Sequence, residues 1–251
     1  MYLNEGLFSL SLGQPFEATE TSIIKALVKR GDFVVDMGAN IGYYTLLLAR
    51  LVGPNGNVSA FEPSPTNCEI LKKNVEINGY RNVEINQKAI SDKSGKARLH
   101  LSVNPADNRI RRDHPESGEG KSDYVDVETV SLDDHFSTRD KSINFIKMDI
   151  QGGEYSAVLG MQRVLANNKN IKIMAEFSPK LLYEFGARPS DFLHILQQKG
   201  FLIYCFDEKS SKIALTTPDG LLIKYPEKND DYTNLLLTRE HLDEDVINLT
   251  V

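Results

Sequence analysis

Apolar residues along this chain follow two patterns that alternate with each other. Short apolar runs occur at 33–35, 58–61, 83–90, 143–150 and 171–177, as expected for strands buried on both faces. Between them, apolar residues recur every three or four positions at 20–30, 41–52, 65–79, 155–165 and 189–199, which is the spacing of amphipathic helices. This order predicts an α/β fold with a mostly parallel sheet and helices on both faces.

The regular alternation stops after residue 90. Segments 96–103 and 124–132 are both strand-like, and residues 125–131 alternate strictly. They predict a β-hairpin, inserted at about 91–142 between the third and fourth strands of one domain spanning 1–251. The segment between the arms, 104–123, is polar and rich in Gly and Pro, so it is either a lid or a mobile tip. Its arginines Arg109, Arg111 and Arg112 are candidates for gripping an anionic or sugar substrate, or form a solvated surface. Segments 201–206 and 234–238 complete the sheet, with an antiparallel return between them.

The turn after the first strand carries the strongest chemical signal. Asp36 closes the strand, and Gly38 and Gly42 follow, which lets the backbone adopt unusual dihedrals and turn amides toward a ligand. The three-glycine fingerprint of dinucleotide-binding proteins is absent, and a carboxylate here would repel a diphosphate. An acid suits a positively charged ligand such as S-adenosylmethionine; the alternative is a plain strand-to-helix turn.

A second acid, Glu62, follows the glycine turn at the spacing typical of nucleotide-binding units. Glu62 ends the second strand 62 − 42 = 20 residues after Gly42, where an acid reaches ribose hydroxyls in a nucleotide-binding unit. Alternatively, Glu62 only favours the positive end of the next helix, which Ser64 can cap. Four acids fall at carboxyl ends of predicted parallel strands, where open α/β sheets bind ligands: Asp36, Glu62, Asp149 and Glu176.

Composition narrows the class of protein. The chain has 251 residues, of which 41% are hydrophobic and 25% charged, as in a globular domain. Its net charge of −6 argues against a nucleic-acid footprint over the whole surface. We expect a cytoplasmic protein, because there is no basic leader, no apolar run long enough for a membrane span, and neither of two cysteines has metal or redox spacing. The histidines show no paired spacing, so we expect no metal site.

Four motifs together resemble the FkbM-type S-adenosylmethionine-dependent methyltransferases. They are DMGANIGYYT at 36–45, AFEPSP at 60–65, VETVSLDD at 127–134 and IKMDIQGGEYSAVLGM at 146–161. The resemblance implies a Rossmann-like class I methyltransferase fold and O-methylation of a hydroxyl on a sugar, glycolipid or secondary metabolite. The expected partner is therefore a small-molecule or glycan acceptor, with no nucleic acid.

The same resemblance implies cofactor contacts residue by residue. Gly38, Asn40 and Gly42 would line the methionine part of S-adenosylmethionine. Glu62 would hold its ribose, and Ala89 would lie beside the adenine.

The catalytic residues are expected at the fourth strand. Lys147, Asp149 and Glu154 match the family's polar cluster there, but Gln151 stands where relatives commonly carry a glutamate. Methyl transfer needs the acceptor oxygen close to the methyl group and a base for its proton, and Asp149 is the expected base, followed by Glu154 and Glu176. Lys147 shares a strand face with Asp149, so it is either a partner of the catalytic acid or of the substrate, or a member of a structural ion pair. Glu154 either touches the substrate or only favours the start of its helix.

Two other function classes remain open at this point. A catalytically silent S-adenosylmethionine-binding module would keep the turn and Glu62 while losing the acceptor-side acids, and Gln151 is the one hint of that. A nicotinamide-dependent oxidoreductase would share the sheet but should carry the missing three-glycine fingerprint.

Overall fold

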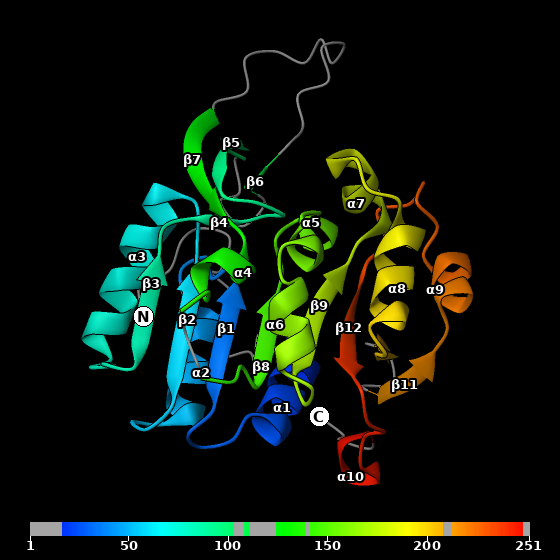
Figure 1. Cartoon of the computed structure of the whole chain (residues 1–251), viewed down its shortest axis with the longest axis horizontal. Helices are drawn as coiled ribbons and strands as arrows, with labels where there is room; N and C mark the ends of the chain where they lie inside the picture. The colour runs from blue at the N-terminus through cyan, green and yellow to red at the C-terminus, as the bar shows by residue number, and fades with distance from the viewer. Residues whose placement is uncertain (1–16, 103–107, 111–123, 139–140, 208–211, 248–251) are drawn as a thin grey trace.

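A computed structural model describes residues 17–102, 108–110, 124–138, 141–207 and 212–247. Arg111, Arg112 and most of the predicted tip at 104–123 lie outside the described residues. The architecture is α/β, with one large sheet covered by helices on both faces and a small sheet at one end (Figure 1). The predicted fold class is therefore confirmed.

The large sheet has eight strands in the order β11-β10-β12-β9-β8-β1-β2-β3. Their bounds are β1 Phe33–Met37, β2 Asn57–Phe61, β3 Val83–Asn86, β8 Phe145–Met148, β9 Lys172–Phe177, β10 Leu202–Asp207, β11 Lys212–Thr216 and β12 Thr233–Thr238. All neighbouring pairs from β3 to β9 are parallel, whereas β12 pairs antiparallel with both β9 and β10. The carboxyl ends of β1, β2, β8 and β9 therefore meet at one edge of the sheet.

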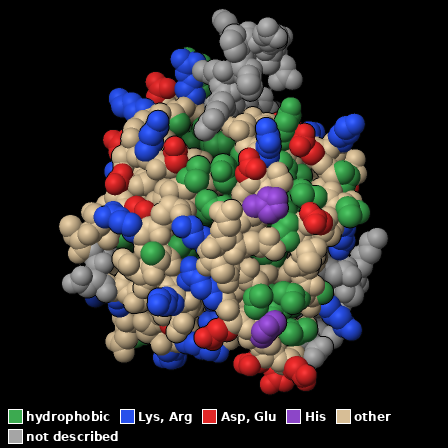
Figure 2. All heavy atoms as spheres, turned by 45° about the vertical axis from the view of Figure 1, so that its right-hand side comes forward, with side chains coloured by type: hydrophobic (Ala, Val, Ile, Leu, Met, Phe, Trp, Pro, Cys, Tyr) green, Lys and Arg blue, Asp and Glu red, His purple; other side chains and the backbone are tan. Residues whose placement is uncertain are grey.

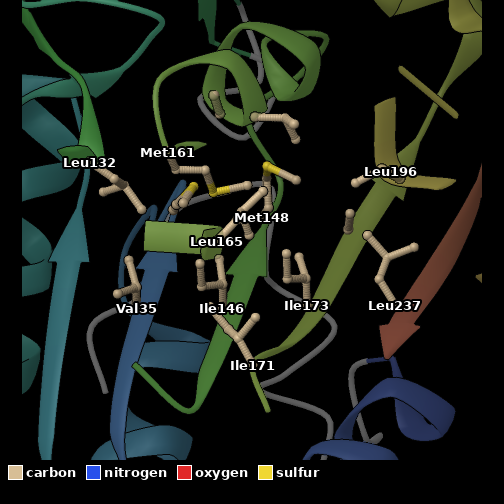
Figure 3. Packing of buried hydrophobic residues seen from close by; sticks show 14 of the residues in the cluster. Val35, Leu132, Ile146, Met148, Met161, Leu165, Ile171, Ile173, Leu196 and Leu237 are labelled. Atoms are coloured by element: carbon tan, nitrogen blue, oxygen red, sulfur yellow. The ribbon is translucent and has the colours of Figure 1, made fainter. Parts of the chain in front are cut away.

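The helices bury both faces of this sheet. Their bounds are α1 Ala18–Leu27, α2 Tyr43–Val52, α3 Pro65–Ile77, α4 Leu132–His135, α5 Glu154–Leu159, α6 Gln162–Asn167, α7 Pro179–Phe185, α8 Pro189–Gln198, α9 Pro218–Lys224 and α10 Glu244–Ile247. Apolar side chains of α4 to α9 pack on one face, where Val35, Ile146 and Ile173 point toward Leu165 (Figure 3). Helices α1 and α2 cover the opposite face, against Val34. Alternating side chains thus give the sheet two apolar faces.

A small four-stranded sheet lies above the carboxyl ends of the large one (Figure 1). Its order is β4-β7-β5-β6, with β4 Ala89–Ile90, β5 Gly95–His100, β6 Arg109–Ile110 and β7 Tyr124–Val130. The predicted hairpin arms pair antiparallel, from Gly95 opposite Thr129 to His100 opposite Tyr124. The insertion is thereby placed over the edge where the strand-end acids lie.

Several predicted bounds were wrong for identifiable reasons. The apolar run 83–90 is two strands, β3 and β4, which belong to different sheets. The expected helix 155–165 is interrupted at Gly160, where a Cβ would lie 2.1 Å from the carbonyl oxygen of Ser91, so the chain must pass close to another backbone. The return between β10 and β12 is antiparallel as expected, but it also contains α9, which Thr217 caps by accepting a hydrogen bond from the Gly220 N–H.

The surface carries both signs of charge. Figure 2 shows a group of acidic side chains at the lower end of the molecule, the end at which Figure 1 places α10. Asp243, Glu244 and Asp245, around the start of α10, are exposed. That end is opposite to the carboxyl ends of the parallel strands in Figure 1. No helix within the described ranges is long and apolar enough to cross a membrane.

One arginine fastens the far end of the sheet. The Arg239 guanidinium follows β12 and donates hydrogen bonds to the carbonyl oxygens of Leu165 (2.9 Å), Asn168 (2.9 Å), Lys169 (3.1 Å) and Lys199 (3.0 Å). It also lies 4.5 Å from the centre of the Phe201 ring. It therefore ties β12 to the ends of α6 and α8.

We predict that Arg239→Met lowers the free energy of unfolding by about 2–4 kcal/mol, because the apolar stem is kept while four carbonyl contacts are lost. Arg50→Met, at an exposed position of α2, serves as the control and should change it by less than about 0.5 kcal/mol. Denaturant titration measures both. Equal losses in the two variants would show that Arg239 does not fasten the sheet.

Candidate active site

Polar side chains replace apolar ones near the carboxyl ends of β1, β8 and β9 and near the adjacent amino end of the antiparallel β12. Asp36 on β1 pairs in register with Lys147 on β8, and Glu176 on β9 pairs with Asn234 on β12. By strand parity all four face the α1 and α2 side, the side on which Val34 contributes to the core. This face is therefore apolar toward the amino ends of the parallel strands and carries a row of polar groups toward their carboxyl ends.

A cavity of about 210 Å³ opens at this end, between the large sheet and the small one. One end of it is lined by the last residue of β2, by residues that follow β2, and by residues 88–90 in and before β4: Phe61, Glu62, Pro63, Asn67, Lys88, Ala89 and Ile90. The other end is lined by Glu17, Tyr43, Tyr44, Lys147, Asp149, Gln151, Glu176 and Asn234. The turn 38–41 lies along the wall, so most of the residues predicted to bind cofactor or acceptor come together here.

The turn after β1 packs tightly against its neighbours. Gly38 has φ +79°, and a Cβ there would lie 1.8 Å from the carbonyl oxygen of Asp149, so only glycine fits. The N–H groups of Gly38 and Ala39 both donate to the Phe61 carbonyl, at 3.0 and 2.9 Å. The expectation that these amides face a ligand was therefore wrong, because they tie the turn to the end of β2. Such a turn is not a phosphate cradle.

Glu62 joins two loops at the cavity. Its Oε2 accepts a hydrogen bond from the Asn40 N–H, and its Oε1 accepts one from the Ser64 N–H, both at 2.8 Å. Ser64 itself caps α3, as expected. Burial raises the pKa of the Glu62 carboxyl to about 7, although the two amide hydrogen bonds partly offset this. Ribose binding by Glu62 stays a prediction, but its carboxylate is held in place at the cavity wall.

Lys147 is a buried ammonium among carboxylates. Its Nζ lies 3.0 Å from Asp149 Oδ2 and 4.6 Å from the centre of the Tyr44 ring. Burial alone would lower the pKa of this ammonium, but the charges of Asp149, Asp36 and Glu17 outweigh it and raise the pKa above its usual value. The contact expected between Lys147 and Asp149 is confirmed, and Lys147 stays protonated.

Asp149, Gln151 and Glu176 form a chain of hydrogen bonds on the cavity wall. Gln151 Nε2 donates to Asp149 Oδ1 at 2.9 Å and to Glu176 Oε2 at 3.2 Å. Burial would raise the pKa of Asp149, but the Lys147 ammonium outweighs it and lowers that pKa. Burial and the charges of Asp149 and Glu154 raise the pKa of Glu176 well above its usual value. Two adjacent carboxyls thus differ in proton affinity.

Asp36 lies deeper than the sequence suggested. Strand β1 continues to Met37, so Asp36 is inside the strand, fully buried, and is not among the lining residues. Its Oδ2 accepts a hydrogen bond from Thr45 Oγ1 at 2.6 Å, and burial raises the pKa of its carboxyl. Within the described part of the chain, Asp36 Oδ1 has no hydrogen-bond partner. Asp36 therefore supports the cavity floor through Thr45 and the charge of Lys147.

Glu154 also lies behind the wall. It is 1% exposed, does not line the cavity, and accepts a hydrogen bond from the Ile150 N–H at 3.0 Å. Burial raises the pKa of its carboxyl to about 7. This geometry holds the loop between β8 and α5 and favours a structural role over contact with substrate.

The cavity mouth brings the insertion against α7. Arg109 of β6 forms an ion pair with Glu184 of α7 at 2.9 Å. Ile110, Phe185 and Tyr232 complete this rim. Of the three arginines assigned to the tip, Arg109 is therefore placed at the cavity.

Sequence reasoning missed several lining residues. The Tyr44 hydroxyl donates a hydrogen bond to Glu17, which precedes α1, and Tyr43 and Asn234 also line the cavity. Tyr43 and Tyr44 follow Gly42 directly, and Asn234 faces Glu176 by strand parity, so these were detectable. Glu17 carries no such signal. Among the described residues, no three His, Cys, Asp or Glu side chains form a group that could hold a metal ion.

Comparison with known proteins gives consistent relatives. The family model described as the methyltransferase FkbM domain matches residues 36–203. The 2-O-methyltransferase NoeI of Sinorhizobium fredii is 27% identical over 208 residues, covering 73% of this chain and 83% of that protein. A protein-L-isoaspartate O-methyltransferase of Aeropyrum pernix is 47% identical over 53 residues, but the match spans only 20% of that enzyme's length and 21% of this chain.

Among solved structures, a putative rRNA methylase from Clostridium thermocellum superimposes with a TM-score of 0.54. The superposition covers 95% of this chain and 97% of that one, at 14% sequence identity. At this identity the likeness concerns the fold alone.

We predict that Glu154→Gln changes the pH dependence of stability. A carboxyl whose pKa is raised on folding stabilises the protein below its unfolded pKa of 4.5, and this is lost as pH rises through the folded pKa of about 7. From pH 5 to pH 8 the variant should therefore gain roughly 2–3 kcal/mol relative to wild type. Denaturant titrations at both pH values measure this, with Glu69→Gln on the exposed side of α3 as control. A difference independent of pH would contradict the assignment.

Proposed function

The chain belongs to the FkbM methyltransferase family and is an S-adenosylmethionine-dependent methyltransferase, and we propose that it methylates a hydroxyl oxygen of a sugar, glycolipid or secondary metabolite. The cavity carries this proposal, because it joins a partly apolar end closed by Glu62 to an acidic end with Asp149 and Glu176. A nucleoside fits the first end, and a positively charged sulfur with an acceptor hydroxyl fits the second.

The residues present suit this cofactor. Asn40 Oδ1 is buried with no protein partner among the described residues, and can accept a hydrogen bond at the cavity wall. A Glu62 oxygen that takes one backbone amide keeps further lone pairs for ribose hydroxyls. Ala89 and Ile90 offer an apolar surface for a purine. We propose that these four residues hold the adenosyl half, with Gly38 allowing the close turn beside them.

The acidic end suits the reaction. Bound S-adenosylmethionine supplies a methyl group already activated by its positive sulfur, so the protein must position an acceptor oxygen and remove its proton. The carboxylates around Lys147 favour positive charge at this end and oppose phosphate. Asp149 and Glu176 both line the cavity, which favours a working enzyme over a silent binding module.

The proposed class of methyl acceptor is supported by similarity to NoeI and by the negative charge of the protein and its cavity. NoeI is named as a 2-O-methyltransferase, and its resemblance to this chain extends over 73% of it, which supports a hydroxyl acceptor here. The net charge of −6 and the acidic cavity disfavour polyanions, so we propose a small-molecule or glycan acceptor and no nucleic acid.

Methyl-labelled S-adenosylmethionine incubated with protein and separate glycan, lipid, metabolite, protein and RNA extracts tests the acceptor. We expect label in the glycan, lipid or metabolite extract, and we expect it to survive mild alkali, because a methyl ether is stable where a carboxyl methyl ester is hydrolysed. Alkali-labile label on protein would indicate carboxyl methylation. Label in RNA would contradict the proposed acceptor class while leaving methyl transfer intact.

We predict that the protein binds S-adenosylmethionine and S-adenosylhomocysteine, with negligible binding of NAD. Glu62→Ala should weaken binding of both adenosyl ligands about ten- to a hundredfold, since it removes charge-assisted hydrogen bonds worth roughly 1.5–3 kcal/mol. Glu69→Ala is the control. Calorimetric titration decides the matter, and unchanged affinity in the Glu62 variant would leave that residue as a loop tie only.

A further inference from the structure

Two carboxyl groups at the ends of β8 and β9 differ in how many partners they have. Both Asp149 oxygens are occupied, Oδ2 by Lys147 Nζ at 3.0 Å and Oδ1 by Gln151 Nε2 at 2.9 Å. Glu176 accepts one hydrogen bond, from Gln151 Nε2 to Oε2 at 3.2 Å. Its other oxygen has no hydrogen-bond partner in the described parts of the chain, while the residue lines the cavity. One oxygen of Glu176 is therefore available to a molecule bound there.

Asp149 is poorly suited to take a proton. Protonation would break its pairing with Lys147, whose ammonium is buried and would then lose its counter-ion. The same ammonium is held over the Tyr44 ring, which leaves it little freedom to move. Asp149 is therefore better described as the fixed counter-ion of Lys147.

Glu176 is surrounded mainly by groups that disfavour a second negative charge. The charged and polar groups facing it are Glu17 before α1, Lys147 on β8, Asp149 and Gln151 on the following loop, Glu154 on α5, and Asn234 on β12, whose amide donates to Glu20 of α1. Lys147 is the one cation among them, and Asp149 already pairs with it. A proton on Glu176 therefore relieves repulsion, whereas a proton on Asp149 creates an unpaired ammonium.

On the basis of the proposed function, we propose that Glu176 accepts the proton of the methyl acceptor, and that Gln151 is the positioning residue that holds it beside Asp149. As the acceptor oxygen bonds to the methyl carbon, its proton passes to the free oxygen of Glu176. The electron pair of the broken carbon–sulfur bond stays on the donor's sulfur, which becomes a neutral thioether. This assignment moves the role of base from Asp149, which the sequence favoured, to the neighbouring strand.

Gln151 is suited to this task as an amide. Its backbone has φ +54°, in the left-handed region, which directs its side chain between the two carboxyls. One Nε2 group donates to both, so it offsets their mutual repulsion without adding charge. A glutamate at this position would place a third carboxylate there and remove the donor.

Carbon-13 NMR of protein labelled at Asp and Glu carboxyl carbons tests the assignment directly. Glu176→Gln and Asp149→Asn identify the two signals. We expect Glu176 to titrate well above the ordinary glutamate value of 4.5, and Asp149 below the ordinary aspartate value of 3.8. In Gln151→Ala the Asp149 signal should titrate at higher pH than in wild type, because it loses a donor. An ordinary or lowered titration of Glu176, or a titration of Asp149 above that of Glu176, would overturn the proposal.

Methyl transfer to the glycan extract gives a second readout. Glu176→Gln should lower the rate roughly 10²- to 10⁴-fold and abolish its rise with pH, whereas Asp149→Asn should keep that rise. Gln151→Glu should move the rise to higher pH, and Glu69→Gln should follow wild type. Calorimetric titration with S-adenosylhomocysteine distinguishes failure of the proposed function from failure of the Glu176 assignment. If wild type does not bind it, the proposed function fails; if every variant binds it but Glu176→Gln keeps the wild-type pH profile, this inference alone fails.

Discussion

The buried ammonium of Lys147 is the interaction on which the acidic end of the cavity depends. Asp36, Asp149 and Glu17 all raise its pKa, and it in turn keeps Asp149 ionised inside the protein. Without it, several carboxyls would crowd the ends of β1, β8 and β9 with no compensating charge, and burial would force protons onto them. The direction of its side chain follows from strand parity, because residue 147 faces the α2 side of the sheet.

Backbone packing fixes where this charge lies. The turn after β1 approaches the carbonyl of Asp149 so closely that Gly38 cannot carry a Cβ, and its amides bond to the end of β2. Glu62 then ties that turn to the loop after β2. The wall of the cavity is thus one connected unit built from three strand ends. Such a unit can present acids in fixed positions, which a set of separate loops could not do.

The sequence predicted the layout of the fold and much of the site, because buried strands and amphipathic helices have distinct periods and each acid followed an apolar run. It could not separate β3 from β4, since a continuous apolar run does not reveal a change of sheet. It also placed Asp36 at the end of β1, where it would reach the ligand, whereas the strand continues for one more residue, Met37, and Asp36 is buried beneath the cavity. The difference between Asp149 and Glu176 depends on Lys147 and Gln151 in three dimensions, which no spacing encodes. Likewise, Glu17 reaches Tyr44 only because α1 folds back over the sheet.

Hydrogen–deuterium exchange with and without S-adenosylhomocysteine tests most directly whether this cavity is the cofactor site. Ligand should slow exchange in peptides covering 38–41, 62–67 and 88–90, each of which contains residues that line the cavity, and should leave the edge strand β11 unchanged. Protection absent from these segments, or confined to the separate hollow formed by residues such as Asp133, Ser142 and Asn167, would contradict the account.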